Sequence, residues 1–584
     1  MKQFFKYTLA TILGVILAGI ILVAILFGIA GGMAGQKSAP TKLKPNSVYE
    51  LKLNGVLVER SEEDPFSIAL AQALGNEDNL TIGLNDILNN IQKAKTDENI
   101  AGIYLNFGTL SAGYASMKEI RDALKDFKKS GKFVVAYADN YLQHEYYLAS
   151  VADKIFLNPQ GMLDWKGLAS EVAFYKNTLD KLGIEMQVVK VGTFKSAVEP
   201  YVNTKMSDAN REQVTVYLNS IWNTLLSEVS DSRKIPFEKL NVYADEMLTF
   251  QPTDKAKQYA LVDSLVYQDE MDSIVKGFLK DSTASIHYVE HEAMCRVPDA
   301  TKYDRNKVAV LYAAGAIDNG SDGIQSKKLV KTINEIAKDN SVKAVVFRVN
   351  SPGGSAYGSE QIWHALSQLK QKKPLIVSMG DYAASGGYYI SCIADSIVAQ
   401  PNTITGSIGI FGLIPNIEGL DKKIGLTFDG VKTNKMSDAI SINRPFRPEE
   451  RDLMQNYVNR GYELFVKRCA DGRRMSVEQI KAIAEGRVWT GKDALGIGLV
   501  DKLGTINDAI SMAVKKAKLT SYQIKEFPKI ETFSEKLLKE LSGGTETRIE
   551  KLKLGEHYQM FKMIEQLDKM DGLQARLPYE LTIR

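Results

Sequence analysis

The sequence contains few of the residues from which metal sites and disulfide scaffolds are built. Among its 584 residues there are three cysteines and five histidines. Cys295, Cys392 and Cys469 cannot all pair with one another, and none of them forms a CxxC motif. This composition argues against a disulfide framework and against a cysteine-rich zinc site. We therefore expect no metal ion.

The sequence also lacks an excess of charge of either sign. Its 73 Lys and Arg residues nearly balance 70 Asp and Glu residues, which leaves a net charge of +3. A dedicated nucleic-acid binder usually carries a marked basic excess, so we expect no nucleic-acid partner. The glycine-rich turns are not followed by the Lys-Ser/Thr pair that holds nucleotide phosphates, so we expect no cofactor.

Only one long hydrophobic run occurs in the chain. No charged residue lies between Lys6 and Lys37, and the run over residues 7–35 exceeds the roughly 20 residues that a spanning helix needs. A cleavable signal peptide has an apolar stretch of only about 7–15 residues. We therefore predict a retained transmembrane helix at 7–35 after a short N-terminal stub, 1–6. Lysines lie on both sides of the run, so the charge pattern does not decide its orientation.

The chain after this run contains an internal duplication. Residues 100–159 align with residues 342–401 at a constant offset, so that Asp139, for example, is aligned with Asp381. Matching segments also occur at the start and at the end of each copy, in the same order. Several matches in register are hard to obtain by chance, so the sequence predicts two related domains in tandem.

Each copy alternates short apolar strands with amphipathic helices. In the second copy, for example, a strand is expected at 343–349 and a helix at 360–369. Strands that are apolar on both faces indicate a parallel sheet covered by helices. We therefore predict an α/β fold with domains at 46–275 and 305–525, followed by a helical tail at 526–584.

The second copy contains two glycine-rich turns that the first copy lacks. One is Asn-Ser-Pro-Gly-Gly-Ser at 350–355, and the other is Ala-Ser-Gly-Gly at 384–387. A Gly-Gly turn that opens a helix leaves backbone N–H groups free to face a ligand. A small turn around Ser385 exposes its hydroxyl, so the pair predicts a nucleophile facing an oxyanion hole. Taken singly, each turn is better explained as a tight turn with small residues.

A nucleophilic serine needs a partner that accepts its proton. No histidine lies between His364 and His557, and His364 is better explained as a structural residue. A lysine can take this role if burial lowers its pKa from the ordinary value near 10.4. Lys195 has mostly small and apolar neighbours, which suits a desolvated amine, whereas Lys435 has charged neighbours, which indicate a solvated one. We favour Lys195, and Lys435 stays the alternative base.

These motifs resemble the signal peptide peptidase A family, also called protease IV, in its long duplicated type. The resemblance rests on residues 350–355 and 383–389, and on Gly-Thr-Phe-Lys-Ser-Ala-Val-Glu-Pro at 192–200. Phe194 departs from the pattern, where tyrosine is also expected; both are aromatic.

The resemblance implies a Clp/crotonase-like fold in both domains and a Ser-Lys dyad. The nucleophile maps to Ser385, the general base to Lys195, and the oxyanion donors to the backbone of Gly354 and Gly386. It also implies a homotetramer on the outer side of the bacterial plasma membrane, a single membrane pass, and a stub that lies in the cytoplasm. The implied substrates are remnant signal peptides and other hydrophobic peptides.

Two other functions stay open at this point. A crotonase-like enzyme acting on an acyl-CoA also uses backbone oxyanion donors, but it would not need Ser385. A membrane-anchored scaffold with an inactive dyad would need neither Ser385 nor Lys195. Loss of peptide hydrolysis on replacing Ser385 separates the peptidase from both.

Overall fold

The computed structural model describes residues 40–61, 81–279, 285–298, 304–318, 323–530 and 573–577, and isolated positions before residue 18. The predicted stub and anchor therefore lie almost entirely outside the described residues. Across the parts of the chain that the structure describes, no helix combines the length and hydrophobicity needed to cross a bilayer. The anchor at 7–35 stays a prediction.

The first half of the chain is built on a parallel sheet. Its central strands are adjacent in the order β1 (Ser47–Val58), β3 (Ile100–Ser111), β4 (Phe133–Tyr141) and β5 (Lys154–Leu163). The shorter strands are β2 (Thr81–Gly83), β7 (Ser264–Leu265) and β8 (His287–Val289). Residues 134–138 of β4 are buried in succession, as expected for a strand covered on both faces. The covering helices include α3 (Leu84–Thr96), α4 (Tyr114–Lys128), α5 (Gln143–Ala149) and α11 (Met271–Gly277).

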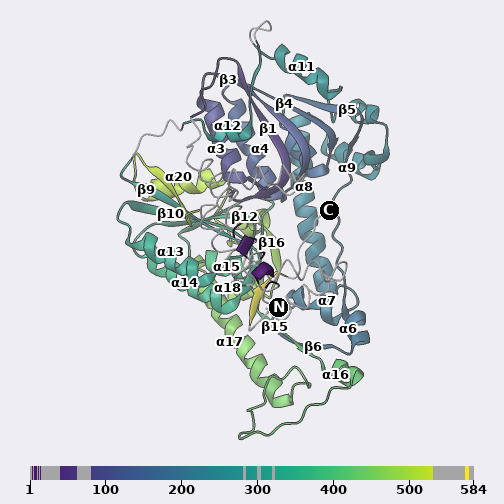
Figure 1. Ribbon diagram of the computed structural model, residues 1–584, viewed down its shortest axis with the longest axis vertical. Helices are drawn as coiled ribbons and strands as arrows, with labels where there is room; N and C mark the ends of the chain where they lie inside the picture. The colour runs from purple at the N-terminus through teal and green to yellow at the C-terminus, as the bar shows by residue number, and fades with distance from the viewer. Residues whose placement is uncertain are drawn as a thin grey trace.

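The second half repeats this arrangement (Figure 1). Strands β18 (Gln523–Phe527), β9 (Lys307–Ala314), β10 (Val342–Ser351) and β12 (Leu375–Ala384) are parallel neighbours, followed by β13 (Ser396–Ala399), β14 (Ile404–Gly406), β16 (Val488–Thr490) and β17 (Lys502–Leu503). Helices α13 (Ser326–Lys338), α14 (Ala356–Lys370), α15 (Gly386–Ser391), α19 (Gly491–Gly496) and α20 (Ile506–Lys516) accompany this sheet. The predicted α/β duplication is confirmed, with strands and helices a few residues longer than the apolar runs that predicted them.

Each half also contains a long helix. These are α8 (Asp208–Arg233) and α17 (Pro448–Arg473), each of 26 residues. The smaller helices are α6 (Lys176–Leu182), α7 (Glu199–Val202), α9 (Phe237–Asp245), α10 (Thr253–Gln258), α12 (His291–Cys295), α16 (Glu418–Ile424) and α18 (Val477–Ile483). In Figure 1 most of the first half, purple to blue, lies above the second half, teal to green. Helix α8 runs down one side, and α6, α7 and β6 lie beside the second half.

One strand of the first half joins a sheet of the second half. Strand β6 (Glu185–Lys190) pairs antiparallel with β15 (Phe411–Asn416) over six residue pairs. The full order of this small sheet is β11 (Gly353–Ser355), β19 (Gln574–Arg576), β15 and β6. The exchange places the segment that follows β6 against the second half of the molecule.

Buried charges fasten the two halves together. Arg348 on β10 lies 2.7 Å from Glu59 and 2.7 Å from Glu119 of the first half, and all three side chains are almost fully buried. Asp381 on β12 accepts hydrogen bonds from the backbone N–H groups of Ala115 and Ser116, at 3.0 and 2.9 Å. Because unpaired buried charges are costly, these contacts define how the halves dock.

Most of the helical tail predicted at 526–584 lies outside the described residues, so it stays a prediction. Of the residues near it that the structure describes, 523–527 form β18 and 574–576 form β19. Strand β18 pairs with β9, and β19 pairs with β11. The apolar positions at helical spacing, 549–564, lie outside the described residues.

Candidate active site

Ser385 occupies the sharp turn between β12 and α15. Its backbone has φ 54° and ψ −113°, and the residue is fully buried. A non-glycine residue with positive φ is strained and needs its surroundings to hold it. Part of that support is a hydrogen bond of 2.8 Å from the Ser385 N–H to the carbonyl of Gly406. The turn therefore presents the hydroxyl in one defined position.

Lys195 reaches Ser385 from the other half of the chain. It follows β6, and its Nζ lies 2.8 Å from the Ser385 Oγ. The same amine lies 3.1 Å from the Oγ and 3.3 Å from the carbonyl oxygen of Ser407. The structure thus brings together the two residues that the sequence proposed as nucleophile and base.

The surroundings of Lys195 favour an uncharged amine. The residue has no exposed surface, and the ring of Phe411 lies 5.9 Å from its Nζ. Burial lowers the pKa of the Lys195 ammonium well below its ordinary value. A neutral amine has a lone pair, so it can accept a proton from the neighbouring hydroxyl.

A tight backbone contact fixes the loop that carries Lys195. A methyl group placed on Gly486 would lie 2.7 Å from both the Cβ and the backbone N of Lys195. Gly486 also has φ +80°, a conformation that favours glycine. Next to it, the carbonyl of Glu485 accepts a hydrogen bond of 2.9 Å from the Phe194 N–H. The second half therefore positions the base that the first half supplies.

The two glycine-rich turns lie side by side. Gly353 and Gly354 have φ values of +98° and +155°, and a methyl group on Gly354 would lie 2.2 Å from the Ile317 carbonyl oxygen. A methyl group on Gly353 would lie 2.7 Å from the backbone N of Gly386. Glycine is therefore required at this approach, and the backbone of Gly386 faces the Gly353–Gly354 turn. This is the arrangement expected of a backbone oxyanion site beside Ser385.

The other sequence candidates lie elsewhere. The Lys435 side chain is 73% exposed and forms an ion pair of 2.6 Å with Glu449, so it is solvated, as its neighbours predicted. His364 is exposed on α14, which agrees with its structural interpretation.

Sequence reasoning missed Ser407. It follows β14, has φ 51°, and is held by a hydrogen bond of 2.7 Å from its N–H to the Arg487 carbonyl. The only signal was the short run of small residues Thr405-Gly406-Ser407. No spacing rule connects such a run with a lysine in the other domain.

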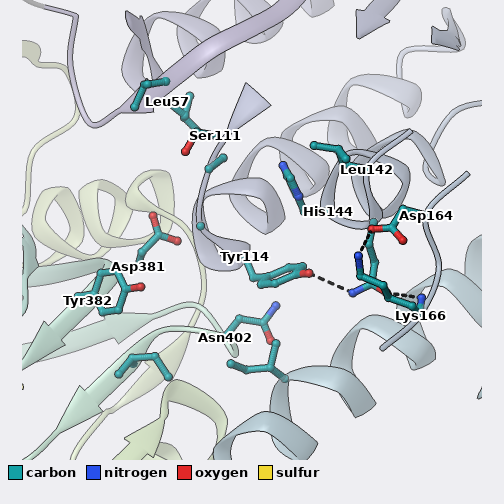
Figure 2. A pocket seen from close by; sticks show the side chains of 16 residues that line it. Leu57, Ser111, Tyr114, Leu142, His144, Asp164, Lys166, Asp381, Tyr382 and Asn402 are labelled. Atoms are coloured by element: carbon teal, nitrogen blue, oxygen red, sulfur yellow. Dashed lines mark hydrogen bonds and ion pairs between the residues drawn. The ribbon is translucent and has the colours of Figure 1, made fainter. Parts of the chain in front are cut away.

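A cavity between the two halves lies at the place in the first half that corresponds to the active site of the second half, and Asp381, Tyr382 and Asn402 of the second half also line it (Figure 2). It has a volume of about 610 Å³, and the residues from the equivalent turns that line it are Ser111, Ala112, Gly113, Leu142, Gln143 and His144. Gln143 takes the place of Ser385 in the repeat. Its amide group bonds to the Gly167 carbonyl at 3.0 Å and accepts from the Gly167 N–H at 2.9 Å. This amide has no nucleophilic hydroxyl, so the first half carries no counterpart of the serine.

Comparisons with known proteins show to which family the chain is similar. The family model "Peptidase family S49" matches residues 126–277 and again residues 367–520, one match in each half. "Protease 4" from Salmonella typhi is 36% identical over 563 residues, which cover 93% of this chain and 90% of that protein.

Shorter relatives match as well. "Putative signal peptide peptidase SppA" from Enterococcus faecium is 34% identical over 229 residues, which cover 38% of this chain and 67% of that protein. Among solved structures, a ClpP1 mutant from Listeria monocytogenes matches 34% of this chain and 94% of its own, at 14% identity. The TM-score of 0.25 is too low to assign the fold, so the Clp/crotonase-like description stays a prediction. The two family matches and the near full-length relative show that this chain belongs to peptidase family S49, as a serine protease of the long duplicated type.

Proposed function

We propose that this serine protease cleaves hydrophobic peptides, remnant signal peptides among them, with a dyad of Ser385 and Lys195. The observation that carries the proposal is the distance of 2.8 Å between the Lys195 Nζ and the Ser385 Oγ in a fully buried setting. Burial lowers the pKa of the Lys195 amine, which suits it to act as a base near neutral pH.

The reaction follows from this geometry. The neutral Nζ of Lys195 takes the proton of the Ser385 hydroxyl while the Oγ attacks the scissile carbonyl carbon. The N–H groups of Gly354 and Gly386 stabilise the oxyanion, and one such donor typically contributes about 2.7–4 kcal/mol. The Lys195 ammonium then gives its proton to the leaving amine as the C–N bond breaks. Water hydrolyses the acyl-enzyme, with Lys195 acting as base again.

The choice of hydrophobic peptides has two supports. Apolar side chains gather near the dyad: the Phe411 ring lies over the Lys195 amine, and Ile408 and Ile410, in the same stretch of sequence, are almost fully buried. The relative from Enterococcus faecium carries signal peptide peptidase in its name. An anchor at 7–35 would hold the protease at the outer face of a bacterial plasma membrane, where such peptides remain after secretion.

We also propose that the chain assembles into a homotetramer. The segment from the end of α16 onward exposes large apolar side chains: Ile424, Leu426, Phe428, Val431, Ile440 and Ile442 are 45–106% exposed. Exposed apolar groups gathered on one segment are typical of a protein interface. In Figure 1 this segment forms the lowest edge of the molecule, between α16 and α17. Light scattering of the detergent-solubilised chain measures the number of subunits.

The test of the proposed function is covalent labelling together with peptide hydrolysis. We expect a fluorophosphonate to label the wild-type chain at Ser385, and Ser385→Ala to lose both labelling and hydrolysis of an apolar peptide. An acyl-CoA enzyme would keep its activity in Ser385→Ala. A chain that neither labels nor hydrolyses peptides in its intact oligomer would be a scaffold, and the proposal would be wrong.

A further inference from the structure

The cavity between the two halves contains a buried amide group, that of Asn402. This residue lies in the turn between β13 and β14, and it is 3% exposed. Among the residues that the structure describes, neither its Oδ1 nor its Nδ2 has a hydrogen-bond partner. A buried amide without partners is costly. Because Asn402 lines a cavity of about 610 Å³, a molecule held there can pair with both of these atoms (Figure 2).

The first half contributes a hydroxyl group to the same cavity. The Tyr114 hydroxyl, at the start of α4, accepts a hydrogen bond of 3.2 Å from the Gln143 Nε2. Burial raises the pKa of Tyr114 to about 12, so this hydroxyl keeps its proton near neutral pH. Its O–H can donate to a ligand, while the Asn402 amide can both donate and accept. A peptide backbone, with N–H and C=O groups in turn, complements such a set.

Much of the remaining wall is aliphatic. Val56, Leu57 and Leu142 of the first half line the cavity together with Ile404 of β14. Val56 and Leu142 are 40% and 36% exposed, so the cavity can be reached from solvent. Its volume lies within the range of about 300–1,000 Å³ that is usual for ligand sites. Walls of this kind favour the burial of aliphatic side chains.

A charged pair lies at one side of the cavity. The Lys166 Nζ lies 2.9 Å from the Asp164 Oδ2, and the two side chains are 42% and 11% exposed. Asp164 also accepts a hydrogen bond of 2.6 Å from the Thr249 hydroxyl. The Lys166 ammonium has three N–H donors, and Asp164 occupies one of them. Lys166 can therefore bind a carboxylate as well, such as the free C-terminus that a cleaved peptide has and an internal segment of a protein lacks.

We propose that this cavity binds short aliphatic peptides that end in a free carboxylate. The Asn402 amide and the Tyr114 hydroxyl bind the peptide backbone, the aliphatic wall buries the side chains, and Lys166 pairs with the carboxylate. The lining residues that the structure describes do not include Ser385 or Lys195, so the site is separate from the dyad. The identification of its ligands as products of hydrolysis by the dyad rests on the proposed function.

Isothermal titration calorimetry of the full-length Ser385→Ala variant, purified in detergent, tests the proposal, because this variant cannot hydrolyse its ligand. The probe is the tripeptide Leu-Ala-Leu with a free carboxylate, compared with the same peptide that has a C-terminal amide. We expect the free acid to bind about three- to tenfold more tightly than the amide, since the exposed Lys166 pairs only with the acid. Lys166→Met, added to Ser385→Ala, should remove this difference.

Substitutions within the cavity assign the binding to this site. Asn402→Leu should weaken binding of the free acid about tenfold, because two hydrogen bonds to the peptide are lost. Its Tm without ligand should not fall, since the change removes a polar group and leaves the wall apolar. Ala112→Phe fills the cavity from the first half and should abolish binding. The matched control is Gln160→Leu, an exposed amide that follows Pro159 as Asn402 follows Pro401, and it should leave binding unchanged.

Two results would overturn the inference. One is the absence of binding at millimolar peptide, and the other is equal binding by Ser385→Ala with and without Asn402→Leu. If Asn402→Leu does not fold, Ala112→Phe decides in its place: retained binding means that the peptide is bound elsewhere.

Peptide hydrolysis and fluorophosphonate labelling of the wild-type chain separate this inference from the proposed function. A chain that hydrolyses an apolar peptide but shows no binding in the cavity overturns the inference while the proposed function stands. A chain that binds Leu-Ala-Leu with the expected effects of the substitutions, but neither labels nor hydrolyses peptides, keeps the binding site and overturns the proposed function.

Discussion

Replacing Lys195 by methionine tests the base and leaves the packing nearly unchanged. Methionine has a similar length and no charge, so it fills the same buried space. A general base typically contributes about 10²–10⁴-fold to the rate. We therefore expect kcat/KM toward an apolar peptide to fall by that factor, which corresponds to about 2.7–5.4 kcal/mol of transition-state stabilisation at 1.36 kcal/mol per tenfold.

The same substitution should change how stability depends on pH. The pKa of Lys195 is lowered by burial, so the unfolded chain binds a proton that the folded chain does not bind, between the folded pKa and the ordinary value. In this window the stability of the wild-type chain rises with pH, by up to about 1.4 kcal/mol per pH unit from this one group. The methionine variant lacks this contribution. The methionine variant also loses the three hydrogen bonds of the Lys195 Nζ, each worth about 0.5–1.5 kcal/mol.

Calorimetry at a series of pH values from 7 to about 10 measures this pH dependence of the stability. The difference in Tm between wild type and Lys195→Met should grow in favour of the wild type as the pH rises. Lys435→Met is the matched control, because its exposed and paired amine should leave both kcat/KM and the pH dependence unchanged. A Tm difference that is independent of pH would mean that Lys195 titrates normally. Loss of activity in Lys435→Met alone would refute the assignment of the base.

Two further substitutions examine the supports of the site. Ser407→Ala removes one hydrogen-bond acceptor of the Lys195 amine. We therefore expect kcat to fall about three- to tenfold, KM to stay constant, and the acidic limb of the pH–rate profile to move to lower pH. An unchanged acidic limb would argue against a positioning role for Ser407. Arg348→Met leaves Glu59 and Glu119 buried without their partner, which costs about 3–5 kcal/mol, so calorimetry should show a large fall in Tm. The control Lys52→Met breaks an exposed ion pair and should change the free energy of unfolding by less than about 0.5 kcal/mol. Equal losses of stability in Arg348→Met and Lys52→Met would mean that Arg348 does not hold the two halves together.

The repeat and the glycine-rich turns could be read from the sequence because they depend on local patterns. Apolar runs of five residues, such as 134–138 in β4, form strands covered on both faces in any such fold. The Gly-Gly turn at 353–354 has backbone angles that only glycine adopts without strain, so its composition already marked the turn. The difference between the copies at Gln143 and Ser385 likewise pointed to the half that carries the nucleophile.

Other features depend on contacts that no local pattern encodes. Ser407 approaches Lys195 only because β14 and the segment after β6 meet in space. Residues 574–576 are extended because β11 and β15 pair with them on either side. Pairing of this kind is a property of the assembled sheet and is not visible in a short segment of sequence.

The amino-acid sequence by itself determined the α/β class, the duplication, the turn that presents Ser385, and the preference for a lysine with apolar neighbours. Each of these follows from hydrophobic periodicity, from backbone angles that favour glycine, or from the cost of burying a charge. Only the tertiary structure decided that Lys195 meets Ser385 at 2.8 Å and that the Ala575 carbonyl oxygen of β19 lies against Gly353 and Gly386. The physical reason is that β6 and β19 pair with strands of the second half that are far from them in the sequence. Such long-range pairing depends on which strand edges are unpaired in the folded chain.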